Sequence, residues 1–372
     1  MTVAPSIKDV LRAQGVPHRR LEAWKYTDLR TVVDEDTIAT AGTVSVTASI
    51  PEGVERVRPI DDSALAKPKS SVASEHAASP GVMAEAAADL ADSGLVLCVP
   101  AGAHIADPLR IDIRGDGHGK IVLVLGPESS LSVVETHHIG GNRLRNVLVN
   151  IHLEDGAKLT HFREAVYSGQ LPSVETLVVY QARNSHYTAH YCQQGTRLSR
   201  LEADLILDGE GAEASLSGLS VLGDEAHADI TTRIEHAAPN TISRQLFKKV
   251  AGGKSRAVYQ GKITVKEGAI GSDSRQTAKA LLLGNRAEAD LKPELEILAD
   301  DVKCAHGAAV GDLDQDSLFY LRSRGIPERE ARGLLVHAFL GEVIDGIENE
   351  EMRKSALAFV DDGLALAMGT NP

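Results

Sequence analysis

The chain has 372 residues, 43% of them hydrophobic and only 3% aromatic, which excludes disorder throughout and predicts a large core of aliphatic side chains. A formal net charge of -13 at pH 7 argues against nucleic acid and anionic membrane as partners, because both attract basic surfaces. Three cysteines without paired spacing, no basic-then-apolar leader and no apolar run near the roughly 20 residues of a membrane span predict a cytoplasmic protein.

Residues 1–93 are predicted to form an N-terminal region of helices and irregular segments. Apolar residues share one helical face from Ser6 onward, and Gly15 followed by Pro17 ends that run. A second short amphipathic piece, "RRLEAWKYTDLR", comes next. From about residue 32 to 92 the sequence is rich in Ala, Ser, Thr and Pro with weak periodicity, which indicates an irregular or partly helical segment.

Residues 94–311 consist of short β-branched runs, such as "KIVLVLG", "VLVNIHL" and "TLVVYQA", separated by turn signals. The turns recur about every 14 residues, a fixed spacing that is typical of a solenoid, in which each unit buries its apolar face against the next one. A β-sandwich also has regularly spaced turns. The pattern therefore favours a solenoid but leaves a sandwich open.

Residues 312–372 return to a helical period. Pro327 is placed to begin a helix that has acidic residues in its first turn. Leu335, Phe339 and Val343 lie four positions apart on that helix and belong to a wide apolar stripe, which must pack on another surface. The stretch "MRKSALAFVDDGLALAM" predicts a last short helix or helix pair.

Two patterns resemble ligand sites but have plainer interpretations. The stretch "GGKS" resembles the end of a phosphate-binding loop, but Lys248 stands where an earlier glycine is required, so a turn is predicted. His186, His190 and Cys192 alternate, so a strand would place all three on one face, where they could bind zinc or iron. A polar sheet face is the favoured interpretation.

Cys98, inside "LVLCVP", is predicted to be a buried apolar side chain.

The run "DDVKCAHGAAVG" places Cys304 and His306 two positions apart, and a strand would put both side chains on one face. Lys303 and His306 are expected to lower the pKa of the Cys304 thiol, because nearby positive charge favours the thiolate that binds iron. Two soft ligands are too few for a closed mononuclear site. Either a partner chain supplies the other ligands or the pair is structural, and the spacing leaves both alternatives open.

The longer stretch "PELEILADDVKCAHGAAVGDLDQDSLFYLRSRGI" resembles the C-terminal signature of the SufB/SufD family, the scaffold proteins of the Suf iron-sulfur cluster assembly machinery. "LEAWKYTDLR" and "GLVLCVPAGAHIADPLRI" are similar to the SufD branch of that family. The resemblance implies a mainly β chain. Its core would be a right-handed parallel β-helix at residues 94–311, between an N-terminal helical region and a C-terminal helical domain at residues 312–372.

The same resemblance implies a function that is not enzymatic. SufD-like chains pair with SufB, and the ATPase SufC docks on the C-terminal helices, so Leu335, Phe339 and Val343 are candidate partner-binding residues and the chain itself binds no nucleotide. His306 matches the SufD histidine that faces SufB, and Cys304 matches the cysteine just before it. Both are therefore candidate ligands of a transient iron-sulfur cluster, or of iron, shared with SufB at the interface. A homodimer is an alternative when SufB is absent.

Two other functions stay open at this point. A purely structural SufD would recruit SufC and position SufB without ligating iron or sulfur, and the iron content of a Cys304 and His306 double alanine variant would distinguish it. A β-helix acyltransferase or polysaccharide-binding protein would need a tighter repeat of about 18 residues or an exposed aromatic or acidic groove. An aromatic content of 3% does not favour that third function.

Overall fold

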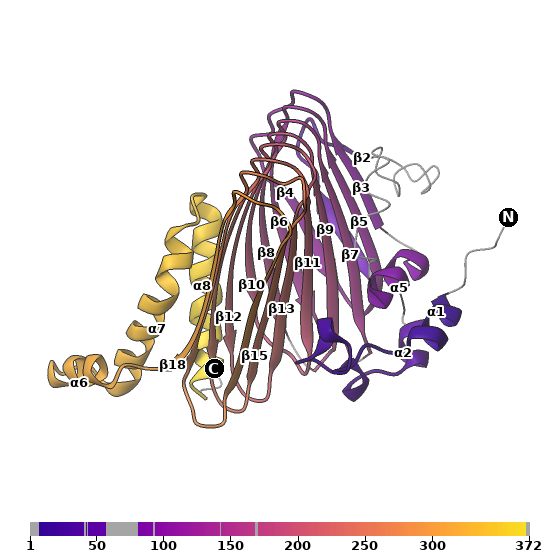
Figure 1. Cartoon of the computed structure of the whole chain (residues 1–372). Helices are drawn as coiled ribbons and strands as arrows, with labels where there is room; N and C mark the ends of the chain where they lie inside the picture. Colours follow the sequence, from indigo (N-terminus) through magenta and orange to yellow (C-terminus); the bar gives the residue numbers. More distant parts are fainter. Residues whose placement is uncertain are drawn as a thin grey trace.

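Figure 1 shows the computed structural model of the chain, in which two long β-sheets stand face to face and helices pack on their outer sides. The structure describes residues 7–40, 42, 44–56, 81–91, 94–141, 143–167 and 170–369. Within these ranges the strands form two nine-stranded sheets, and from β3 onward successive strands alternate between them. We call the sheet of β4, β6 and the later even-numbered strands the even sheet, which β1 joins, and the other the odd sheet, which β2 joins. The even sheet has the order β1 (Ser45–Ser49), β4 (Leu109–Arg114), β6 (Ser130–Ile139), β8 (Lys158–Tyr167), β10 (His186–Gln193), β12 (Glu213–Leu222), β14 (Ile242–Ala251), β16 (Asp273–Leu282) and β18 (Lys303–Asp312). The odd sheet has the order β17 (Glu288–Ile297), β15 (Arg256–Val265), β13 (His227–His236), β11 (Ser199–Leu207), β9 (Ser173–Gln181), β7 (Arg145–Leu153), β5 (Gly117–Leu125), β3 (Gly94–Val99) and β2 (Glu55–Arg56).

The strand pairing confirms the predicted solenoid and excludes the sandwich. Within each sheet, neighbouring strands from β3 to β18 are parallel. Arg145 of β7 pairs with Ser173 of β9, and His227 of β13 pairs with Arg256 of β15. One coil of about 28 residues therefore contains two strands and two turns, which is twice the spacing of about 14 residues that the turns predict. Antiparallel neighbours, as a sandwich requires, occur among the described strands only where β1 and β2 join the sheets.

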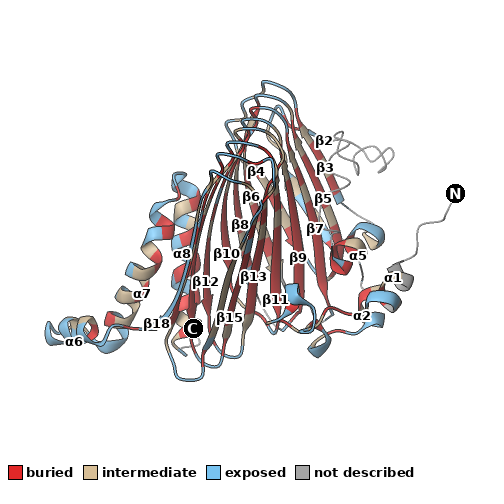
Figure 2. Ribbon diagram, in the orientation of Figure 1, coloured by how far each residue is buried: buried red, intermediate tan, exposed pale blue. Residues whose placement is uncertain are grey.

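The core of the solenoid lies between the two sheets, where every second residue of a strand points inward. Figure 2 shows the middle strands largely in red because few of their residues reach solvent. Leu97, Ile111, Leu123, Leu205 and Ile234 are among the side chains that fill this space. Each coil buries its apolar face against the next coil, so the stability of the solenoid comes mainly from contacts between neighbours.

The N-terminal region contains more regular structure than the sequence predicts. Its helices pack around a small core that includes Leu11, Trp24 and Ile38. They are α1 (Ile7–Gln14), η1 (Glu22–Trp24), η2 (Leu29–Thr31), α2 (Glu35–Thr40) and α5 (Val82–Leu90). The segment predicted as irregular or partly helical also contains β1 and β2, which pair antiparallel with β4 and β3 at the first end of the solenoid. Residues 57–80 of that segment and Ser6 lie outside the described residues.

The C-terminal region is helical, as predicted. It consists of α6 (Gln315–Ser323), α7 (Glu328–Asp345) and α8 (Glu350–Ala367), and Pro327 directly precedes α7. Apolar side chains of α7 and α8, among them Val336 and Phe359, pack on Leu219 and Val250 of the even sheet. None of the described helices is long and apolar enough to cross a membrane.

The "GGKS" stretch is a turn between β14 and β15, as predicted. Gly253 has a φ of +60°, in the left-handed region that glycine adopts most readily. A Cβ added at Gly252 would overlap the backbone of Ala367 at the end of α8. The two glycines therefore allow a tight turn to pack under a helix.

Candidate functional site

The second end of the solenoid is open. Among the described strands β17 and β18 are the last of their sheets, and each pairs with a described neighbour on one side only. Apolar side chains are exposed here, with Val310 at 48%, Ile297 at 43% and Leu298 at 55% of their surface. An edge strand presents unpaired backbone N–H and C=O groups, so an open edge with exposed apolar residues favours association with another chain.

Cys304 and His306 both lie on β18, at this open end. Their neighbours in the parallel register are Ser274 and Gln276 of β16, which are buried and point into the solenoid. Cys304 and His306 therefore continue the inward face of the even sheet, as the prediction of a shared strand face requires. Because no further coil covers β18, Cys304 is only half-buried and His306 is exposed.

The expected activation of the Cys304 thiol is wrong for the chain by itself. Partial burial raises the pKa of Cys304, and the nearby carboxylate of Asp273 raises it further. The side chain packs against a small apolar cluster that contains Ile263 and Val265 of the odd sheet. Lys303 is the preceding residue of the strand, so its side chain points to the opposite face. The thiol is therefore protonated at neutral pH until another group or a metal favours the thiolate.

The strand β10 carries His186, His190 and Cys192 on its outward face, as predicted. Burial holds the pKa of His190 at about 4 and raises the pKa of Cys192 far above its usual range. His190 Nδ1 lies 2.7 Å from Ser217 Oγ, and Cys192 packs within the apolar layer under the C-terminal helices. Among the described residues, no three His, Cys, Asp or Glu side chains gather in an arrangement that could hold a metal ion. The sheet face is polar at His186 and His190, as the favoured interpretation has it, whereas at Cys192 it is apolar and covered by the C-terminal helices.

Cys98 is half-buried rather than buried, so its prediction is wrong. It occupies an outward position of β3, between the inward side chains of Leu97 and Val99. The residue opposite Cys98 is Glu55 of the short antiparallel strand β2. The prediction failed because the continuous apolar run does not show which residues of the strand point inward. One face of β3 is turned towards solvent, and Cys98 lies on that face.

The three candidate partner-binding residues lie on α7. Val343 is buried, and Leu335 and Phe339 are half-buried against the apolar layer between α7 and the even sheet. The Nζ atom of Lys248 lies 5.0 Å from the ring centre of Phe339. The apolar stripe thus packs on the chain's own sheet, and Val343 is not available to a partner in this arrangement.

The more accessible apolar residues of the C-terminal region are on α6, which projects away from the solenoid (Figure 1). Phe319 is 73% exposed and Tyr320 is 57% exposed. Asp314 caps the helix by accepting hydrogen bonds from the backbone N–H groups of residues 316 and 317. Two exposed aromatic rings lie on this capped, projecting helix, and we call the face that carries Phe319 and Tyr320 the α6 surface. The sequence analysis missed it, although "FYLRSRG" contains both rings.

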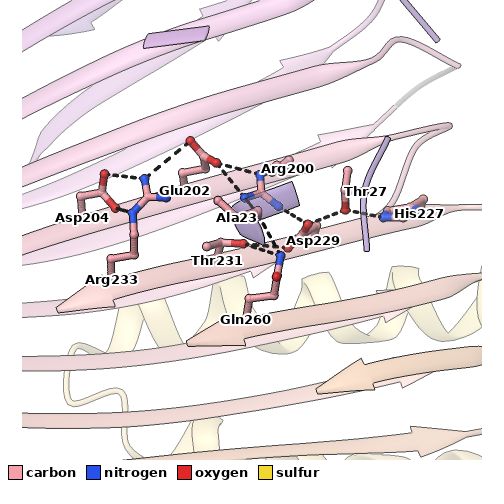
Figure 3. Close-up of polar contacts among 10 residues, drawn as sticks. All are labelled: Ala23, Thr27, Arg200, Glu202, Asp204, His227, Asp229, Thr231, Arg233 and Gln260. Carbon is pink, nitrogen blue, oxygen red and sulfur yellow. Dashed lines mark hydrogen bonds and ion pairs between the residues drawn. The ribbon is translucent and has the colours of Figure 1, made fainter. Parts of the chain in front are cut away.

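The sequence analysis also missed a buried charge network on the outer face of the odd sheet, drawn in Figure 3. Arg200 is its centre and is fully buried. Its guanidinium donates hydrogen bonds to Glu202, at 2.7 and 2.9 Å, and to Asp229. Arg233 bonds Asp204 with distances of 2.6 and 2.7 Å. The network joins β11 and β13 through side chains that are far apart in the sequence.

The N-terminal segment around η1 lies directly on this network. Arg200 Nη2 donates to the carbonyl oxygen of Ala23 at 2.5 Å, and the guanidinium lies 4.1 Å from the ring centre of Trp24. Thr27 Oγ1 donates to Asp229 Oδ2 at 2.5 Å. Figure 3 shows the contacts of Ala23 and Thr27 with this network. Together with the Trp24 contact, they hold the stretch "LEAWKYTDLR" across the outer face of the odd sheet.

A family model and the named relatives of this chain indicate the same protein family. Residues 113–339 match the model of the SufBD core domain, described as SUF system FeS cluster assembly. The chain is 28% identical to the iron-sulfur cluster assembly protein SufD of Escherichia coli, over 96% of this chain and 91% of that protein. It is 29% identical to an iron-sulfur cluster assembly SufBD family protein of Mycobacterium tuberculosis, over 95% and 91% of the two chains. It is 31% identical to the chloroplastic protein ABCI7 of Arabidopsis thaliana, over 70% and 58%.

Proposed function

The chain belongs to the SUF-system iron-sulfur cluster assembly family defined by the SufBD core domain, and from that premise we propose that it is a scaffold subunit that pairs with SufB and recruits the ATPase SufC. It works in the cytoplasm without catalysing a reaction itself. Its three cysteines are free, which suits a reducing compartment. Iron and sulfur are the cargo that the assembled complex handles.

The observation that carries this proposal is the open end of the solenoid. The first end finishes in the short antiparallel strands β1 and β2, of 5 and 2 residues, whereas the second end presents two full strands of 10 residues each, β17 and β18. A second solenoid with a similar open end can continue both sheets and cover Val310, Ile297 and Leu298. SufB is the partner that the family membership favours, and a second copy of this chain is the alternative when SufB is absent.

Pairing at this end would bring Cys304 and His306 to the boundary between the two chains. A thiol and an imidazole are soft ligands that suit iron, but two of them do not complete a four-ligand site. Ligands from the partner would complete the site, and metal binding would remove the proton from the Cys304 thiol. A site that is divided between two chains can also release its cluster when the chains move apart.

Replacing His306 by alanine is expected to lower the iron and sulfide content of the reconstituted complex at least tenfold. The expected reason is the loss of one ligand from a site that has few. The measurement is anaerobic reconstitution of the purified complex, followed by iron and sulfide analysis. Because His306 is exposed and makes no core contact, the complex itself should form with unchanged stoichiometry.

His104 provides a matched control, since it is an exposed histidine beside Ser130 at the first end of the solenoid. The His104→Ala variant should assemble as much iron and sulfide as the original chain. Normal assembly by His306→Ala would show that this histidine is not a ligand. Equal losses in both variants would show a general effect of removing surface histidines.

A purely structural role is the second candidate, and the raised pKa of the half-buried Cys304 thiol favours it. In that case the chain would recruit SufC and position SufB without touching iron. The double replacement of Cys304 and His306 by alanine separates the two functions. A ligand role requires the double variant to lose iron, whereas a structural role leaves its iron content unchanged.

We assign SufC docking to the α6 surface rather than to the apolar stripe of α7. Phe319 and Tyr320 are exposed there, while Val343 is already buried against the even sheet. Aromatic side chains are frequent anchors of protein interfaces. A docked ATPase at α6 could pull on α7 and α8, which pack on β12 and β14 near the open end.

Replacing Phe319 by serine is expected to weaken SufC binding by about thirtyfold, the loss of an aromatic anchor worth about 2 kcal/mol. The dissociation constant is measured by titrating the ATPase into the complex of this chain with SufB. Leu357→Ser is the matched control, because Leu357 is a 40% exposed apolar residue on α8. SufC binding that Phe319→Ser leaves intact, or that Leu357→Ser weakens equally, would contradict the assignment.

A further inference from the structure

Gln276 occupies the inward position of β16 that is in register with His306 of β18. Its side chain is 99% buried, since only 1% of its surface is exposed. The atom Gln276 Oε1 has no hydrogen-bond partner among the described residues. A buried amide oxygen without a partner is costly, so one beside a functional residue calls for an explanation.

The amide nitrogen of Gln276 is engaged on the inner side of the solenoid. Gln276 Nε2 donates to the hydroxyl of Tyr259 at 2.9 Å, and that hydroxyl donates to Gln245 Oε1 at 3.1 Å. Thr232 Oγ1 donates to the same oxygen at 2.8 Å. Tyr259 has one hydroxyl proton, which it gives to Gln245, so it must accept from Gln276. This direction leaves Gln276 Oε1 without a donor and, one coil further in, Gln245 Nε2 without an acceptor among the described residues.

The lack of a side chain at Gly261 leaves room for the Gln276 amide. A Cβ added at Gly261 of β15 would overlap Gln276 Nε2 and the Tyr259 hydroxyl. The next position beyond Gly261 in the register is Pro293 of β17, which has no N–H to offer. On β18 the inward positions hold a cysteine, His306, an alanine, a valine and an aspartate, so the imidazole is the strong side-chain donor of this strand.

We propose that Gln276 is a positioning residue for His306, whose ring N–H donates to Gln276 Oε1 when the pairing partner covers β18. This bond selects one imidazole tautomer and leaves the other ring nitrogen facing the interface, free to bind iron. In metal sites generally, a carbonyl oxygen that accepts a hydrogen bond from the second ring nitrogen of a ligating histidine raises the basicity of that ligand and fixes the orientation of its ring. The inference rests on the proposed function, because it assumes that His306 is a ligand.

The test measures Fe²⁺ affinity, not cluster output, in the anaerobic complex of the full chain with its pairing partner. Gln276→Leu removes the acceptor and is expected to weaken Fe²⁺ binding by 10- to 100-fold, a typical loss for an outer partner of a ligand. Gln276→Glu keeps an acceptor oxygen and should restore the affinity to within about threefold. Gln245→Leu is the matched control, since it breaks the same hydrogen-bond chain one coil further from His306.

Three results would overturn the positioning role. They are unchanged Fe²⁺ affinity in Gln276→Leu, an equal loss in Gln245→Leu, and no recovery in Gln276→Glu. The His306→Ala complex, titrated in parallel, separates this inference from the proposed function. If His306→Ala binds Fe²⁺ as well as the original chain, the proposed ligand is wrong. If only His306→Ala loses affinity, the ligand stands and Gln276 has no part in orienting it.

Discussion

Replacing Arg200 by alanine is expected to lower the free energy of unfolding by about 3–5 kcal/mol, the cost of removing one partner from a buried ionic network. The guanidinium is fully buried, and its loss would leave Asp229 as a buried carboxylate without its cation and Glu202 with only the longer ion pair to Arg233 at 3.9 Å. The same replacement removes the hydrogen bond to Ala23 and the contact with Trp24. The N-terminal segment should therefore detach before the solenoid unfolds.

The measurement uses urea and two signals. The chain has one tryptophan, Trp24, which is buried on Arg200, so its emission reports the N-terminal segment, while far-ultraviolet circular dichroism reports the strands. In the variant the emission change should come at lower urea than the dichroism change. The control is Arg183→Ala, because Arg183 makes an exposed ion pair with Asp155 at 3.5 Å and should contribute less than about 0.5 kcal/mol. An Arg200 variant with the original urea midpoint would contradict the expected role of the network.

The solenoid could be predicted from sequence because its signal is local and repeated. Each coil needs two turns, and turn residues are visible one at a time in the sequence. Strand alternation likewise predicted that Cys304 and His306 share a face, which the register with Ser274 and Gln276 confirms. The number of strands per coil was not predictable in the same way, since turn spacing does not say which strands pair.

The interactions that depend on distant residues could not be predicted from sequence. Arg200 meets Ala23 and Trp24 across more than 170 positions of the chain, and no local pattern marks such a contact. The apolar stripe that includes Val343 predicted that α7 packs on something, but amphipathicity does not identify the surface. The pKa of Cys304 was predicted in the wrong direction because neighbours in sequence were considered, whereas burial against the odd sheet dominates.

Acidification from pH 7.5 to pH 5 is expected to destabilise the chain by at least about 6 kcal/mol, with about 2 kcal/mol from each of His190, His227 and His236. Burial lowers the pKa of His190, His227 and His236 from 6.5 to about 4. Their ring nitrogens lie within 2.7 to 3.1 Å of the hydroxyl groups of Ser217, Thr27, Thr241 and Ser243. Neutral hydroxyl partners do not compensate a buried positive charge as a carboxylate would.

The direction of the effect follows from proton uptake. In the unfolded chain each imidazole binds a proton below about pH 6.5, whereas in the folded chain it stays neutral down to about pH 4. The unfolded state binds more protons throughout this window, so stability is complete above pH 6.5 and falls as the pH drops towards 4. The urea midpoint, measured at pH 7.5, 6 and 5, should fall steadily. A His190→Asn variant should lose about 2 kcal/mol less stability over this range, while the exposed-site variant His104→Ala should follow the original curve. A midpoint that stays constant down to pH 5 would mean that these imidazoles are already charged, or reach water, in the folded chain.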